Sequence, residues 1–86
     1  MQPLMDYVYA IYNFTHEKLY IGQTSNLEKR LQMHNNHTLG GYTARYDGVW
    51  KLMYHEEVET RPEALIREKQ LKSFRGREFI RQHIPR

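Results

Sequence analysis

Residues 19–34 constrain the fold most, because their side-chain periodicity changes from that of a strand to that of a helix. Leu19 and Ile21 alternate with Tyr20, as residues on the two faces of a strand do. Gly22 follows where a Cβ would be awkward, which is typical of a tight turn or a close backbone approach. The segment therefore predicts a strand that runs almost directly into a helix.

The helix start within this segment is marked by a capping box. Ser25 and Glu28 have the spacing of such a box and predict a helix over residues 26–35. Leu27 and Leu31 lie four residues apart and form an apolar stripe for the core. The helix is therefore expected to pack one face against the preceding strand.

A polar row lies beside that stripe. Arg30 and His34 are also four residues apart, so they follow one line along the helix surface. Together with Tyr20, at the end of the strand, they are expected to converge near the helix start. Such a polar cluster at the edge of a core is a candidate functional site.

Two more segments alternate like strands. Residues 7–13 (YVYAIYN) are aromatic and β-branched and should pair with residues 19–23 as an antiparallel hairpin. Residues 50–56 (WKLMYHE) should form a third strand, with Trp50, Leu52 and Tyr54 on one face. Between them, residues 36–48 contain three glycines and predict a long loop.

A second capping box begins the next helix. Thr60 and Glu63 have the box spacing, and Pro62 occupies the first turn, where its missing N–H is harmless. The helix is expected to end at about Phe74 or Arg75, with Gly76 as the stop. Its expected buried side consists of Ala64, Leu65, Leu71 and Phe74.

Glu68 falls within that apolar side of the helix. A dry, unpaired carboxylate would be destabilising there by several kcal/mol. An arginine, a metal ion or water in a cleft should therefore compensate its charge.

The last residues predict a short third helix, from Phe79, Ile80, His83 and Ile84 at helical spacing. The expected fold class is α/β in the α+β sense, with a small three-stranded, mainly antiparallel sheet and about three helices. The element order is β-β-α-β-α-α, in a single domain over residues 1–86. No repeat or linker interrupts it.

Composition excludes several classes of protein. The 86 residues include no cysteine, so disulfides, thiol catalysis and cysteine-based zinc sites are excluded. The five histidines have no zinc-binding spacing. The N-terminal residues lack the charged start and apolar run of a signal peptide, and no apolar run reaches membrane-spanning length, so we expect a cytoplasmic protein with no membrane partner.

Charge is distributed unevenly along the chain. Residues 61–86 carry eight lysines and arginines against three glutamates, a balance of +5, whereas residues 1–60 have a balance of −2. A basic face of this kind can bind nucleic-acid phosphates. A solvated helix surface explains the same charges equally well.

In their order along the chain, these residues resemble the GIY-YIG nuclease family, and most closely its small stand-alone branch of UPF0213-like proteins. Tyr7-Val8-Tyr9 stands where the family has GIY, and Tyr20-Ile21-Gly22 is a literal YIG. The run 25–31 matches the segment that carries the family's arginine. Residues 63–68 match the segment that ends in its metal-binding glutamate, and Tyr42-Thr43 is similar to a signature of the small branch. Two departures are that Tyr7 replaces the glycine of GIY and that Gln23 replaces a lysine frequent in DNA-repair members.

The resemblance implies hydrolysis of DNA phosphodiester bonds assisted by Mg²⁺ or Mn²⁺. Glu68 would hold the metal, since Mg²⁺ favours oxygen ligands and keeps several waters. Arg30 would clamp the phosphate, and His34 would bind it or protonate the leaving group. Tyr20 or Tyr9 would act as the base or orient the attacking water. Residues expected to contact nucleic acid are Gln23, Tyr42, Arg45, Lys69, Lys72 and Arg75.

Three other functions fit the same residues. The chain could be a non-catalytic nucleic-acid-binding module that stacks bases on its aromatic residues and contacts phosphates with its basic ones. It could instead be a catalytic subunit that stays silent until a protein partner supplies the DNA target. It could also retain only the fold of a nuclease.

Overall fold

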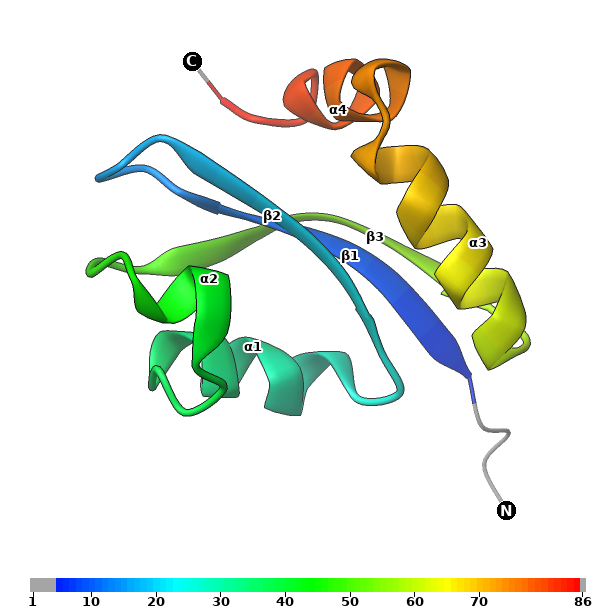
Figure 1. Cartoon of the computed structure of the whole chain (residues 1–86), viewed down its shortest axis with the longest axis horizontal. Coiled ribbons are helices and arrows are strands. Elements are labelled where there is room, and N and C mark those ends of the chain that lie inside the picture. Colours follow the sequence, from blue (N-terminus) through cyan, green and yellow to red (C-terminus); the bar gives the residue numbers. More distant parts are fainter. Residues whose placement is uncertain (1–4, 86) are drawn as a thin grey trace.

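The computed structural model describes residues 5–85, which form a three-stranded antiparallel sheet with helices on both faces (Figure 1). The strands have the order β2-β1-β3, so β1 is central and β2 and β3 are edges. The elements are β1 (Asp6–Asn13), β2 (Lys18–Thr24), α1 (Leu27–Asn35), α2 (Gly41–Ala44), β3 (Trp50–Val58), α3 (Arg61–Lys72) and α4 (Phe74–Arg81). The predicted fold class is confirmed. The predicted loop over residues 36–48 is wrong at its centre, where it forms the short helix α2.

The register of the hairpin brings the two predicted tyrosines together. Tyr9 of β1 lies opposite Gly22 of β2, and Ile11 lies opposite Tyr20. Tyr9 and Tyr20 are therefore diagonal neighbours on one face of the sheet, with ring centroids 6.3 Å apart.

A bulge in β3 changes the alternation that the sequence predicts. Ala10 pairs with Tyr54 and Ile11 pairs with Leu52, so Met53 has no counterpart on β1. As a result, Tyr54 packs on the opposite face from Trp50. The prediction that Tyr54 shares a face with Trp50 and Leu52 is wrong, because a simple period of two does not reveal an extra residue.

Each face of the sheet has its own core. On the α3 and α4 side, the fully buried residues are Val8, Ala10, Ile21, Ala64, Leu71 and Ile80. On the α1 side they are Tyr9, Ile11 and Trp50, with the predicted stripe of Leu27 and Leu31 packed against them. The second core is rich in aromatic side chains that carry a polar atom, so it places polar atoms inside the molecule.

The caps at the helix starts agree with the sequence in one case and differ in the other. Thr60 caps α3 as predicted, accepting a hydrogen bond from the Glu63 N–H at 3.3 Å. For α1, however, the cap is Asn26, whose side chain accepts from the Lys29 N–H at 3.0 Å. Ser25 is therefore not the cap, because it lies in a bend after β2 and the helix begins two residues later, at Leu27.

The end of α3 also differs from the prediction. Lys72 is its last residue, and Ser73 caps α4 by accepting from the Gly76 N–H at 3.2 Å. Gly76 lies inside α4, where a Cβ would be 2.3 Å from the Gln70 carbonyl oxygen, so a glycine allows the two helices to approach. Because the helix ends early, Phe74 is not buried but 79% exposed, and Leu65 is also on the outer side.

Within residues 5–85, none of the helices has the length and apolar character needed to cross a membrane.

Candidate functional site

A buried chain of polar side chains runs from β1 through α1 to α2. The Tyr9 hydroxyl and His34 Nε2 lie 2.7 Å apart, and His34 Nδ1 lies 2.8 Å from the Thr43 hydroxyl oxygen. All three residues are at most 2% exposed. Since a neutral imidazole has one donor and one acceptor nitrogen, either tautomer satisfies both neighbours.

The environment of His34 keeps its ring neutral. Burial and the nearby positive charge of Arg30 lower the pKa of His34 from 6.5 to about 4. Both ring nitrogens are occupied by hydrogen bonds within the protein. This geometry favours a role for His34 in positioning Tyr9 over direct contact with a phosphate.

Tyr20 lies between this buried row of hydrogen-bonded side chains and the protein surface. Its ring is 5.0 Å from that of His34 and stacks at 6.1 Å on Tyr42, which is 39% exposed. Burial and the Glu68 carboxylate raise the pKa of Tyr20, and Arg30 lowers it by a smaller amount. The phenol is therefore protonated near neutral pH.

Tyr9 is also a neutral phenol. Burial first and then its neighbour Tyr20 raise the pKa of Tyr9 strongly, with Arg30 opposing them. Since Tyr9 is also hydrogen-bonded to His34, Tyr20 is the better placed of the two predicted candidates to meet a ligand.

Gly22 makes room for both phenols. A Cβ built on Gly22 would lie 2.8 Å from the Tyr9 hydroxyl oxygen and 2.9 Å from Tyr20 Cε2. The glycine of the YIG motif is therefore explained by side-chain packing across the hairpin rather than by a turn.

The predicted arginine and glutamate come from helices on opposite faces of the sheet. Arg30 belongs to α1 and Glu68 to α3, and β2 is an edge strand of that sheet (Figure 1). Both charges influence the pKa of Tyr20, with Glu68 raising it and Arg30 lowering it by less. The candidate site therefore draws on helices from both faces of the sheet.

The charge of Glu68, for which the sequence predicted compensation by an arginine, a metal ion or water, is met by partial solvent exposure and by a lysine. Its side chain is 20% exposed, and its closest ion pair is a long one, 3.8 Å to Lys72 Nζ one helical turn away. A partly solvated carboxylate with only a long ion pair can accept a cation. Within residues 5–85 no group of three or more acidic or histidine side chains could hold a metal ion, so Glu68 would act with at most one other such side chain.

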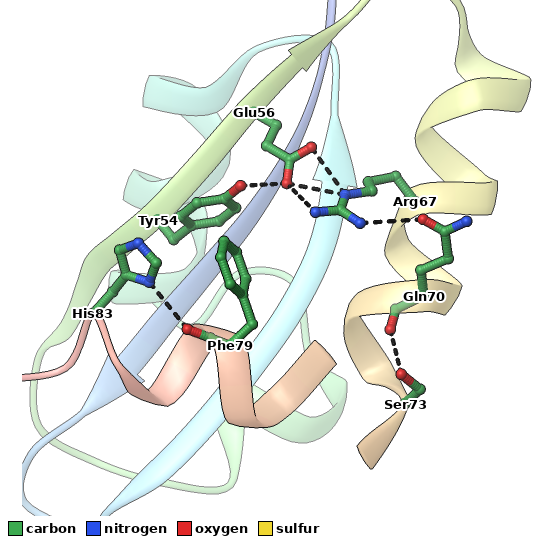
Figure 2. Close-up of polar contacts among 7 residues, drawn as sticks. All are labelled: Tyr54, Glu56, Arg67, Gln70, Ser73, Phe79 and His83. Atoms are coloured by element: carbon green, nitrogen blue, oxygen red, sulfur yellow. Dashed lines mark hydrogen bonds and ion pairs between the residues drawn. The ribbon is translucent and has the colours of Figure 1, made fainter. Parts of the chain in front are cut away.

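A polar network fixes α3 relative to the sheet (Figure 2). Arg67 donates to Glu56 of β3 through Nε and Nη2, at 2.8 to 3.0 Å, and through Nη1 to Gln70 at 3.2 Å. The Tyr54 hydroxyl donates to the same Glu56 carboxylate. Since Arg67 precedes Glu68, this two-pronged ion pair fixes the rotation of α3 and with it the direction of Glu68.

The residues predicted to contact nucleic acid are distributed unevenly. Tyr42 stacks on Tyr20 and so belongs to the site, whereas Gln23 is half-buried in β2 on the opposite face from Tyr20. The remaining four are exposed basic residues at the end of α2 and on α3 and α4, namely Arg45, Lys69, Lys72 and Arg75. Of these, Lys72 is linked to the site through Glu68.

Sequence reasoning missed the role of Thr43. Its hydroxyl meets His34, and its carbonyl accepts a hydrogen bond from Trp50 Nε1 at 3.2 Å. The Tyr42-Thr43 pair was the available signal, but the loop prediction for that region hid its structural role.

Comparison with known proteins now decides the family. The family model described as the GIY-YIG catalytic domain matches residues 5–79. The chain belongs to the GIY-YIG family. This is a nuclease family, and its YIG motif is Tyr20-Ile21-Gly22, at the edge strand around which the candidate site is built.

Relatives of this GIY-YIG domain carry the UPF0213 name. A UPF0213 protein of Clostridium perfringens is 47% identical over 68 residues, which cover 79% of this chain and 71% of that protein. One of Staphylococcus saprophyticus is 39% identical over 59 residues, 65% of this chain and 67% of that protein. The solution NMR structure of a UPF0213 protein from Bacillus halodurans has the same fold, with a TM-score of 0.54 and 24% identity over 91% of this chain and 83% of that one.

Proposed function

We propose that this GIY-YIG domain is a metal-dependent endonuclease that hydrolyses phosphodiester bonds in DNA, in structure-specific processing or repair within the cytoplasm. The observation that carries the proposal is the position of Tyr20, which lies in the matched catalytic domain, packs against His34 and is influenced by the charges of Glu68 and Arg30. A cationic clamp and an anionic cation-binding group are suited to metal-assisted phosphodiester hydrolysis, and the phenol can orient a water.

Each residue has a role that its surroundings support. Glu68 would hold Mg²⁺ or Mn²⁺, which, when bound, supplies positive charge to the phosphate and the leaving oxygen. Arg30 would bind the phosphate oxygens through its planar guanidinium. Tyr9 and His34, buried and hydrogen-bonded to each other, would keep the inner side of the site rigid.

Tyr20 would contact the attacking water. Because burial and then Glu68 raise the pKa of Tyr20, the free protein presents a phenol that orients water rather than a phenolate that deprotonates it. With a cation held at Glu68, the carboxylate charge would be offset, and Tyr20 would be closer to acting as a base. Tyr20→Phe should therefore lose most of its turnover while retaining DNA binding.

A cleavage assay on linear, flap and branched DNA with Mg²⁺ or Mn²⁺ tests the proposal. Glu68→Ala should abolish metal-dependent cutting, whereas the matched control Glu63→Ala, an exposed change on the same helix, should cut normally. Equal cutting by both variants would reject Glu68 as the metal ligand, and absence of cutting by the unmodified protein would reject an autonomous nuclease.

A binding module, acting alone or with a targeting protein, is the second candidate function. The observation in its favour is the raised pKa of Tyr20, because the protein alone does not prepare a strong base. Salt-dependent DNA binding without cutting on any substrate would support this function. Cutting that appears only when a partner protein is added would identify the partner-dependent form.

A further inference from the structure

A groove of about 670 Å³ crosses the edge of β2 at the hairpin end of the sheet. Its size is that of a site for a small ligand or for part of a chain molecule. Aromatic and basic side chains dominate its lining, which includes Tyr12, Phe14, Lys18, Tyr42, Arg77 and Arg81.

The aromatic part of the groove is preformed. Tyr12 and Phe14 pack edge to face, with ring centroids 4.9 Å apart, so each holds the orientation of the other. Phe14 is nevertheless 43% exposed. A large apolar ring that is rigid and half open to solvent is suited to stacking against a flat ligand.

The basic part of the groove comes from α4 and the start of β2. Arg77 donates through Nε to the Lys72 carbonyl at 3.0 Å, which orients its guanidinium, and Arg81 forms an exposed ion pair with Glu78. Glu17 is the acidic residue of the lining, against Lys18 and the two arginines. The groove therefore carries a net positive charge that favours phosphate groups.

Tyr42 joins this groove to the candidate cleavage site. It lines the groove and stacks on Tyr20 with an interplanar angle of 23°. A strand that leaves Tyr20 along the edge of β2 would therefore enter the groove directly.

We propose that the groove binds an unpaired DNA strand next to the cleavage site, with bases stacked on Phe14 and Tyr42 and phosphates on Lys18, Arg77 and Arg81. This inference rests on the proposed nuclease function and specifies its substrate as DNA with an unpaired segment. Paired bases do not fit the site, because their faces are already stacked within the duplex, whereas the groove offers aromatic faces together with cations.

Binding of a single-stranded thymidine oligonucleotide that contains one 2-aminopurine tests the groove. It is measured in the Glu68→Ala background with chelator, so that no cutting intervenes. Phe14→Leu should weaken binding about fivefold to a hundredfold and reduce quenching of the 2-aminopurine, because the stacking ring is lost. Phe14→Tyr, which keeps the ring, should bind normally, and thermal unfolding of each variant verifies that it is folded.

The arginines are tested by salt dependence. Arg77→Gln and Arg81→Gln should each weaken binding and reduce the slope of log affinity against log salt by about 0.7. Arg61→Gln removes an exposed arginine at the start of α3, the end away from α4 and outside the groove. It should leave both quantities unchanged (Figure 1).

Three results would overturn the groove proposal: unchanged binding in Phe14→Leu, equal weakening by Arg61→Gln and Arg77→Gln, or equally strong competition by duplex DNA. Cutting and groove binding fail separately. If the unmodified protein binds through the groove but does not cut, only the nuclease proposal is rejected. If it cuts and the groove variants cut equally well, only the groove proposal is rejected.

Discussion

The Tyr9 hydroxyl and His34 Nε2 lie 2.7 Å apart, in a fully buried hydrogen bond that joins the central strand to α1. Removing one partner of a buried pair leaves the other without compensation for its lost hydration. This contact therefore links the stability of the domain to the arrangement of its candidate site.

Tyr9→Phe should lower the free energy of unfolding by about 1–3 kcal/mol, because it leaves His34 Nε2 buried and unsatisfied. Urea unfolding followed by circular dichroism measures the change. Tyr12→Phe is the matched control on the same strand, since the Tyr12 ring lines an open groove, and it should change stability by less than about 0.5 kcal/mol. Equal effects in the two variants would contradict the role given to the buried bond.

Stability should fall as the pH is lowered from 6.5 toward 4, because of His34. Its pKa is about 4 in the folded protein, well below the ordinary value of 6.5, so the unfolded chain binds more protons in this window. The contribution is fully present above about pH 6.5, and about 2 kcal/mol of it should be lost between pH 7 and pH 5.

The contribution of His34 to this pH dependence is isolated by His34→Gln, which does not titrate in this range. The variant should be less stable at pH 7 but should lose less stability than the unmodified protein on acidification. The difference between their urea midpoints at pH 7 and pH 5 measures the effect. Parallel pH profiles for the two proteins would show that His34 is not the responsible group.

Gly22→Ala should displace the two phenols that its Cβ would approach within 3 Å. We expect a loss of about 1–3 kcal/mol of stability, as in other overpacked sites. The ring proton shifts of His34 in NMR spectra should change as well, because Tyr9 moves. Ser25→Ala, an exposed change three residues further on, serves as the control and should leave those shifts in place.

Arg67→Met should release α3 from β3 by removing the two-pronged contact with Glu56. Because Arg67 and Glu56 are 35% and 24% exposed, solvent screens the pair, and we expect a loss of about 1 kcal/mol. The exposed pair of Arg81 and Glu78 provides the comparison, and Arg81→Met should have almost no effect on unfolding. Amide hydrogen exchange along α3 would show whether the helix itself is loosened.

The local sequence predicted the strands well, because their alternation is strong and their partners are close in the chain. The residues 7–13, 19–23 and 50–56 all fall within observed strands.

Caps and helix ends were less predictable. Ser25 and Asn26 are both good caps, and the choice depends on the Thr24 hydroxyl, which accepts from the Asn26 N–H at 3.1 Å. A glycine at position 76 is typical of a helix end, but the close approach of Gly76 to Gln70 is visible only in three dimensions.

The residues of the candidate site were proposed from the sequence, but their arrangement was not. Tyr9, Tyr20, Arg30, His34 and Glu68 were identified from spacing and resemblance, and they belong to β1, β2, α1 and α3. The sequence could not reveal that both His34 nitrogens are occupied, because Thr43 reaches His34 through a helix within a predicted loop. The upward shift of the Tyr20 pKa likewise depends first on burial and then on the Glu68 charge, both of which only the fold provides.

The bulge at Met53 makes the length of β3 as important as its composition. If that one residue were deleted, the strand beyond it would turn over, so that Tyr54 would leave Phe79 and Glu56 would leave Arg67. One inserted residue thus lets a single strand supply its first half to one core and its second half to the other. A deletion there should therefore be far more harmful than any substitution of Met53.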